Sequence, residues 1–216
     1  MPGQTNSKRT KTASSNRGRP FDADGAATRN RILTAARDCF SRHGYANATN
    51  RMIAAEAGIT ASALYNYFPT KADIYRAVVQ EGEHFVAIAY EDIIRQNESP
   101  LDALCALLDF NMEMHGEFPE LTFFFGHIRS EISRHPELAN IGDNTDSPTS
   151  KILRKLIHQA RLKGEISDAI PEKNIEQMLF ACMLGMSAYG LKVEVKQQKK
   201  NMLAFRMLLD GSLVNR

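Results

Sequence analysis

The segment TNRMIAAEAGITASALYNYFPTK, residues 49–71, decides the fold, because it predicts two short helices around a tight corner and the start of a third. Thr49, Thr60 and Thr70 are each placed to accept a hydrogen bond from a free backbone N–H in the first turn of a helix. Gly58 suits the positive φ that often follows a helix end, so it marks the corner. Two such helices around a corner that contains Gly are typical of a helix-turn-helix, whose second helix enters the DNA major groove.

The alternative, from spacing alone, is a helical hairpin within an ordinary bundle. The residue types on the second short helix favour DNA binding instead. Leu64 and Phe68 lie four residues apart and form its buried face, while Pro69 prevents its continuation. The outer faces carry small residues together with Tyr, Asn and Ser, whose polar groups can bind phosphates or base edges.

Over residues 29–79 the chain resembles the DNA-binding domain of the TetR family of bacterial transcriptional repressors. Three consecutive segments carry the resemblance: RILTAARDCFSRHGYANAT, GITASALYNYF and PTKADIYRAVV. It implies an all-α fold, with an N-terminal three-helix DNA-binding domain and a C-terminal helical domain that binds an effector and dimerises. We therefore expect a disordered basic arm over residues 1–20, a DNA-binding head over 21–76 and an effector-binding and dimerisation body over 77–216.

The resemblance implies that ten positions contact double-stranded DNA. At the matching positions, family members contact phosphates or bases from the helix-turn-helix and from the start of the next helix. These positions hold Thr49, Asn50, Arg51, Thr60, Ala61, Ser62, Tyr65, Asn66, Tyr67 and Lys71. Arg51 can bind guanine through two hydrogen bonds, and Lys71 adds charge where a helix N-terminus already favours anions. Ala61 offers only a methyl contact, so we expect base specificity to depend on Arg51, Ser62 and Asn66.

The charge distribution divides the chain in the same way. Residues 1–76 hold 12 Lys and Arg against 5 Asp and Glu, whereas residues 77–216 hold 15 against 20. A basic head on an acidic body fits a chain that binds DNA at one end only. No apolar run precedes Phe21, and none reaches the roughly 18 residues of a membrane span. We therefore expect no secretory signal, no membrane partner and a cytoplasmic location.

Residues 1–20 contain five Lys and Arg and no acidic residue, in a background of Ser, Thr, Asn and Gly. Such a segment cannot bury enough apolar surface to order itself. Two roles stay open for it. It is either a solvated tail or an arm that lies on phosphates or in the minor groove.

The apolar spacing predicts helices throughout, without a strand. We expect a first helix over residues 26–43 that ends at Gly44, and a long helix over 70–96 that joins head and body. Gly82 within the long helix indicates either a bend or close packing. Residues 140–150 collect turn formers and predict a mobile loop.

Two residue types allow more than one interpretation. Tyr45 follows the first helix and either packs on the core of the head or contacts the DNA backbone. Cys39, Cys105 and Cys182 are odd in number, widely spaced and set in helical apolar patterns. This pattern indicates reduced thiols in the core, and a redox switch is the less favoured alternative.

The two C-terminal helices carry apolar residues on more than one side, so they need a second surface to cover them. In the helix expected over residues 171–195, one face holds Ile175, Met178, Leu179, Cys182, Met186 and Tyr189, while Phe180, Leu184 and Leu191 project elsewhere. The resemblance implies that both helices form a four-helix interface of a homodimer. The alternative is burial within one subunit. Two heads related by a two-fold axis would read an inverted-repeat operator.

Aromatic and methionine side chains of the body are candidates for a ligand pocket, because they line apolar cavities and adapt to their contents. The predicted lining is Met112, His115, Phe118, Phe124, Phe125, Met183, Met186 and Tyr189. Each of these residues also fits an ordinary core. The expected effector is a small, largely apolar molecule.

His127, Glu131 and His135 fall at i, i+4 and i+8 of one helix, a spacing that can hold a metal. No Cys pair or HExxH motif accompanies them, so we favour a solvated polar face and expect neither a metal nor a cofactor. The body also lacks a catalytic constellation and a Gly-rich phosphate loop, so we expect no enzyme. The main hypothesis is a repressor that an effector releases from DNA, and the alternative is an architectural DNA-binding protein without a ligand.

Overall fold

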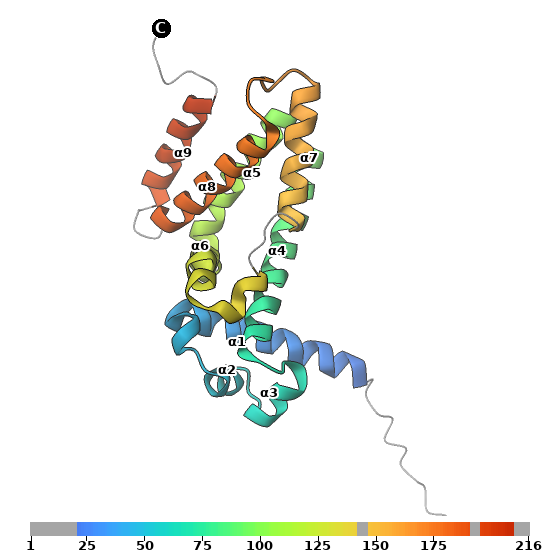
Figure 1. Ribbon diagram of the computed structural model, residues 1–216, viewed down its shortest axis with the longest axis vertical. Coiled ribbons are helices and arrows are strands. Elements are labelled where there is room, and N and C mark those ends of the chain that lie inside the picture. The colour runs from blue at the N-terminus through green and yellow to red at the C-terminus, as the bar shows by residue number, and fades with distance from the viewer. Residues whose placement is uncertain (1–20, 142–146, 191–194, 210–216) are drawn as a thin grey trace, which may run out of the picture.

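The computed structural model describes residues 21–141, 147–190 and 195–209, and within these ranges every regular element is a helix (Figure 1). The all-α prediction is therefore confirmed. The elements are α1 (Phe21–Asn47), α2 (Asn50–Glu56), α3 (Ala61–Tyr67), α4 (Lys71–Gln96), α5 (Pro100–Glu117), α6 (Pro119–Arg134), the 3-10 helix η1 (Pro136–Ile141), α7 (Pro148–Leu162), α8 (Glu172–Gly190) and α9 (Val195–Leu209).

The helix caps of the head lie where the sequence predicts them. Thr49 and Thr60 each accept a hydrogen bond from the backbone N–H three residues further on, at 3.2 and 3.1 Å. Thr70 and Asp73 form a capping box, in which each side chain accepts a hydrogen bond from the backbone N–H of the other residue. Gly58 adopts a φ of 68°, which a residue with a Cβ rarely tolerates, and so turns the chain between α2 and α3.

Four aromatic rings form the centre of the head core. The ring of Tyr75 lies 5.0, 5.2 and 5.1 Å from those of Phe40, Tyr45 and Phe124, measured between centroids. Tyr45 is 3% exposed, so of its two interpretations the structure supports packing on the core. α1 leaves helical geometry at Gly44, where its helix was predicted to end, and this break directs Tyr45 inward.

The body is the bundle of α4–α9 above the head in Figure 1, and α4 runs from one part to the other. α6 packs against α1, so the head core includes Phe124 of α6 and Leu138 of η1. A second core, around Tyr90, Leu107 and Leu156, joins α4, α5, α7 and α8. Because the first core continues to Val79, the division between head and body at residue 76 stays a prediction.

Gly82 allows α4 and α6 to approach each other closely. A Cβ built on Gly82 would lie 2.3 Å from Cζ of Phe125, far inside van der Waals contact. α4 keeps one helical range across this position. Of the two interpretations of Gly82, the structure therefore supports close packing.

The predicted loop over residues 140–150 is wrong at both ends. Asn140 and Ile141 belong to η1, and α7 already begins at Pro148. Ser147 caps α7 by accepting from the N–H of Ser150, whose hydroxyl in turn donates to the buried carboxylate of Glu176. Turn formers here serve as a helix start, because Ser followed by Pro fits an N-cap and the first helical position.

Other boundaries also differ from those expected. α1 begins at Phe21, five residues before the predicted start. The helix expected over residues 171–195 ends at Gly190, and α9 begins at Val195. The predicted arm over residues 1–20 lies outside the described residues.

Candidate functional site

α2 and α3 lie at the end of the molecule opposite the body (Figure 1). Their outer surface carries polar side chains that are exposed to solvent. Six of the ten predicted DNA-binding residues are exposed. Tyr65 has more than half of its surface accessible, at 53%. The exposed residues are Thr49, Arg51, Thr60, Ser62, Tyr65 and Asn66. A basic side chain, an amide, hydroxyls and a phenol are the groups that contact phosphates and base edges.

Three other predicted residues are half-buried. Ala61 and Tyr67 pack against the core of the head. Asn50 opens α2, and its Oδ1 is buried without a hydrogen-bond partner among the described residues. These positions fix the surface from below, whereas the six exposed residues form its outer side.

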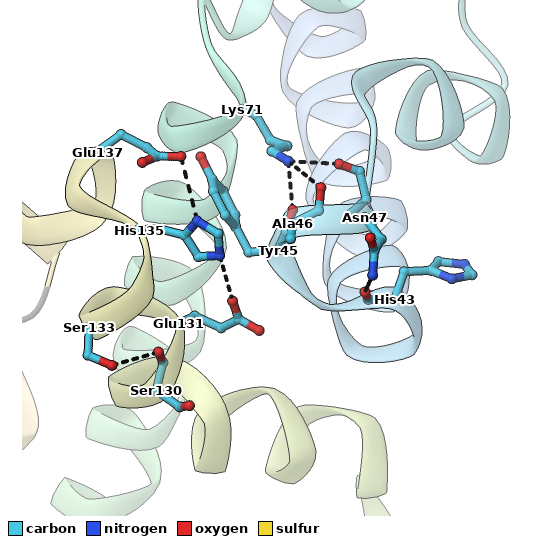
Figure 2. A network of polar contacts seen from close by, with 11 residues as sticks. His43, Tyr45, Ala46, Asn47, Lys71, Ser130, Glu131, Ser133, His135 and Glu137 are labelled. Atoms are coloured by element: carbon cyan, nitrogen blue, oxygen red, sulfur yellow. Dashed lines mark hydrogen bonds and ion pairs between the residues drawn. The ribbon is translucent and has the colours of Figure 1, made fainter.

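Lys71, the tenth residue, turns inward and joins the end of α1 to the start of α4 (Figure 2). Its Nζ donates to the carbonyls of Tyr45, Ala46 and Ala48 at 2.6, 3.3 and 3.0 Å. It also lies 4.3 Å from the centre of the Tyr45 ring. Burial holds the pKa of the ammonium below its usual value. An ammonium has three N–H donors, so in this structure the donors of Lys71 are occupied by the carbonyls at the end of α1. Its contact with phosphate stays a prediction.

A second polar cluster joins the head to the body around His135 (Figure 2). Its ring packs at a tilt of 59° against that of Tyr45, with 4.9 Å between centroids. Nε2 lies 3.3 Å from a carboxylate oxygen of Glu131, and Nδ1 lies 3.9 Å from one of Glu137. Burial, followed by the carboxylate of Glu137, raises the pKa of Tyr45 to about 12. The phenol therefore stays neutral and serves the junction as a hydrogen-bonding group.

The solvated face expected for His127, Glu131 and His135 is a wrong prediction. The Glu131 and His135 side chains are only 16% and 22% exposed, because α6 lays this face against α1. Nδ1–H of His127 donates instead to the carbonyl of Phe123 at 2.8 Å. Among the described residues, no cluster of three or more His, Cys, Asp or Glu side chains is placed to hold a metal ion.

A cavity of about 120 Å³ lies in the body between α4, α5, α6, α7 and α8. Most of its wall is apolar. Four residues of α4 line it at spacings of four, three and four, which is one face of a helix. The full lining is Val79, Glu83, Val86, Tyr90, Asn111, Phe125, Ile128, Arg129, Thr149, Phe180, Met183 and Leu184.

The cavity brings together only part of the predicted pocket. Phe125 and Met183 line it. Phe124 is 3% exposed within the head core, since one residue along a helix turns a side chain through about 100°. Met112 is turned away for the same reason, because its neighbour Asn111 faces the cavity. Phe118 is 44% exposed at the corner between α5 and α6. The side chains of His115, Met186 and Tyr189 lie outside the described residues.

The predicted pocket did not include the polar residues of the lining, because the prediction was based on aromatic and methionine side chains. Asn111 donates through Nδ2 to the hydroxyl of Tyr90 and to the carbonyl of Leu107, both at 2.6 Å. Glu83 interrupts the apolar face of α4, and burial raises the pKa of its carboxyl. A carboxylate at a position where helical spacing demands an apolar residue was the signal available in the sequence. Phe180 and Leu184, expected to project elsewhere, also face the cavity.

The three thiols are free and at least half-buried. Cys39, Cys105 and Cys182 are free, and the first is buried while the other two are half-buried. Burial and the carboxylate of Glu56, which accepts from the thiol at 3.0 Å, raise the pKa of Cys39 to about 12. The reactive form of a thiol is the thiolate, so the raised pKa lowers the reactivity of Cys39.

Within the described ranges, no helix combines the length and apolar character needed to cross a bilayer.

Comparison with known proteins gives a family match in the head. The family model of bacterial regulatory proteins, tetR family, matches residues 32–78, which run from α1 into α4. The HTH-type transcriptional regulator UidR of Escherichia coli (strain K12) is 25% identical over 198 residues, covering 89% of this chain and 96% of its own. The HTH-type transcriptional repressor BepR of Brucella suis biovar 1 is 26% identical over 171 residues, covering 76% and 80%.

The likeness in fold extends through the body. The transcriptional regulator FadR from Bacillus subtilis, solved in complex with stearoyl-CoA, aligns with a TM-score of 0.71 and 18% sequence identity. The alignment covers 86% of this chain and 99% of that one. These relatives are regulators and not enzymes. With its matching helix-turn-helix, the chain belongs to the TetR family of bacterial regulatory proteins and is a DNA-binding transcriptional regulator.

Proposed function

We propose that this chain is a repressor that binds an inverted-repeat operator as a homodimer and leaves it when a small, largely apolar effector enters the body. One observation carries the proposal. The cavity is walled by α4 and α6, and the same two helices pack against the head. Any ligand that alters the spacing of these helices acts directly on the elements that hold the DNA-binding surface.

The exposed side of α2 and α3 supports sequence-specific binding. Arg51, Ser62 and Asn66 point away from the core and carry the donors and acceptors that base edges recognise. Thr49, Thr60 and Tyr65 surround them with groups suited to phosphate. Ala61, Tyr67 and Asn50 lie beneath this layer, and Lys71 anchors it through the carbonyls at the end of α1. We assign base reading to the first group and positioning to the others.

The operator is found by selecting bound sequences from a pool of random duplexes at near-physiological salt over several rounds. An inverted repeat is the expected product, since a two-fold dimer reads two half-sites. Replacing Arg51, Ser62 or Asn66 by Ala should then reduce binding to the selected operator more than binding to random DNA. Equal losses on both DNAs would assign these residues to phosphate positioning.

The dimer is proposed from the apolar surface of the last two helices. Met178 of α8 is 49% exposed and Leu203 of α9 is 59% exposed, although both belong to apolar stripes. α9 is held to α5 by an ion pair between Arg206 and Asp109 at 2.8 Å, and its exposed Leu203 is available to a symmetry mate. Met178→Glu combined with Leu203→Glu should yield monomers in sedimentation measurements. Dimers that persist would place the interface elsewhere.

Release by an effector is tested by filling the cavity from within. Val86→Phe places a ring in the cavity and should lower operator affinity, because it imitates an occupied body. Ile88→Phe changes a 49% exposed residue two positions further along α4 and should leave operator affinity unchanged. If both variants bind the operator as the wild type does, the cavity is not coupled to the head.

The architectural alternative predicts DNA binding without a sequence motif and a fully packed body. The cavity in the body disfavours this alternative, because a fully packed body would have none. Selection that recovers no motif, together with binding that moderate salt abolishes, would support this alternative.

A further inference from the structure

One charged side chain interrupts the apolar wall of the cavity on α4. Glu83 stands between Val79 and Val86 on the face that α4 turns to the cavity, and its side chain is partly buried. Among the contacts of residues 21–141, 147–190 and 195–209, none joins the Glu83 carboxylate to a cation or a hydrogen-bond donor. Burial alone accounts for its raised pKa.

A carboxylate in such a place is unfavourable for the empty protein. Removing an ionised group from water costs free energy unless an opposite charge or donors replace the lost water. The carboxylate that is buried within the described ranges, that of Glu176, has such partners. Glu176 accepts from Ser150 and lies 3.6 Å from Arg154. The Glu83 carboxylate has no such partner among the described residues, so it is open to a cationic group of a molecule in the cavity.

The opposite wall decides which charge fits. Arg129 of α6 also borders the cavity, but its side chain is exposed to solvent, where water screens its charge. No ion pair between Arg129 and Glu83 is present in the described structure. A ligand cation would therefore meet an unpaired carboxylate, whereas a ligand carboxylate would be placed beside a like charge within the apolar wall.

We propose that the cavity binds an apolar molecule that carries a protonated amine, with the amine on the Glu83 carboxylate. This assignment rests on the proposed effector site and names the chemistry of its ligand. The apolar part of the ligand then lies along Val86, Phe180 and Met183. At about 120 Å³ the cavity is close in size to one of about 150 Å³ that holds benzene, so a group of about six carbons fits.

Three six-carbon molecules that differ in their polar group test this assignment. We would titrate hexylamine, hexanol and hexanoate into the full chain by calorimetry at pH 7, without DNA. Hexylamine should bind about tenfold or more tightly than hexanol, because its ammonium makes a charge-assisted hydrogen bond, and hexanoate should bind most weakly. Methyl NMR signals of ¹³C-labelled methionine, with Met183→Leu for assignment, should place the amine in this cavity.

Two variants of α4 separate the role of Glu83 from general charge. Glu83→Gln keeps the shape and removes the charge, and should reduce the preference for hexylamine over hexanol to less than about threefold. Glu81→Gln makes the same change at an exposed position outside the lining and should keep the preference. The thermal unfolding of both variants without ligand shows whether either is misfolded.

Two results would overturn the assignment. Equal affinities for the three molecules would make the cavity indifferent to charge. Tightest binding of hexanoate, lost in Arg129→Gln, would assign the cavity to anions. Because no DNA is present, either result leaves the repressor proposal standing, and that proposal fails separately if Val86→Phe leaves operator affinity unchanged.

Discussion

The two cores of the chain differ in how completely they are filled. In the head core, the ring of Tyr75 lies about 5 Å from three other aromatic rings, and the Lys71 ammonium binds the carbonyls at the end of α1. In the body, the core around Tyr90 and Leu156 borders a cavity lined by Glu83, whose carboxylate has no partner among the described residues. A surface that reads DNA has to be held in one geometry, whereas the proposed effector site has to accommodate a ligand. The difference indicates which part of the chain is rigid and which part yields.

The largest effect should come from opening the filled core. Phe40→Ala removes a ring that is 3% exposed and should lower the free energy of unfolding by about 3–5 kcal/mol. Phe180→Ala removes a ring that already borders a cavity, so it loses fewer contacts and should cost less than half as much. Guanidinium unfolding measures both. Equal costs would contradict the contrast between the two cores.

Lys71 tests whether the rigidity of the head depends on a buried anchor. Lys71→Met deprives three carbonyls of their donor and should lower the free energy of unfolding by about 1.5–3 kcal/mol. Arg51→Met, at an exposed position, should change stability by less than about 0.5 kcal/mol and relax the base preference at its position in the operator. A flattened slope of log K against log salt for Lys71→Met without loss of stability would instead support its contact with phosphate.

Gly82→Ala should transfer strain into the cavity. The added Cβ would lie 2.3 Å from the Phe125 ring, so the ring must shift, at a cost of about 1–3 kcal/mol. Hexylamine affinity should fall in parallel. Gly25→Ala is the matched control in α1, where a Cβ meets nothing within 4 Å, and it should be neutral or stabilising by up to about 1 kcal/mol. Unchanged stability and ligand affinity in Gly82→Ala would show that the helices separate freely.

The smallest effect concerns pH. Burial raises the pKa of Glu83 in the folded state above its value in the unfolded state, which is about 4.3. The protonated carboxyl therefore contributes its full stabilisation of the folded state below the unfolded pKa. This contribution is lost as pH rises through the folded pKa. Glu83→Gln should therefore unfold at a higher temperature than the wild type at pH 7, with a smaller difference at pH 4. Glu81→Gln should show no such pH-dependent gain. A destabilising Glu83→Gln at pH 7 would reveal a stabilising partner.

Local chemistry made much of the head predictable. The caps at Thr49, Thr60 and Thr70 and the corner at Gly58 each depend on residues within one turn, so the sequence contains the whole cause. The same was true of the break at Gly44.

Features that depend on distant helices were not predictable in this way. His135 faces Tyr45 only because α6 folds back on α1, and the inward turn of Lys71 depends on where α1 ends. Of two adjacent aromatic residues, the sequence did not tell which one faces the head and which one the cavity. Hydrophobic periodicity assigns a face to a helix but does not name its neighbour.

These two neighbours on α6 have a consequence for how such a protein changes over generations. Phe124 lies in the head core, while Phe125 lines the cavity, with 5.8 Å between their ring centres. A mutation that alters ligand preference by moving the backbone at Phe125 also displaces Phe124 and so disturbs the head. New preferences at the proposed effector site are therefore acquired at lower risk through α5, α7 and α8, whose lining residues take no part in the head core.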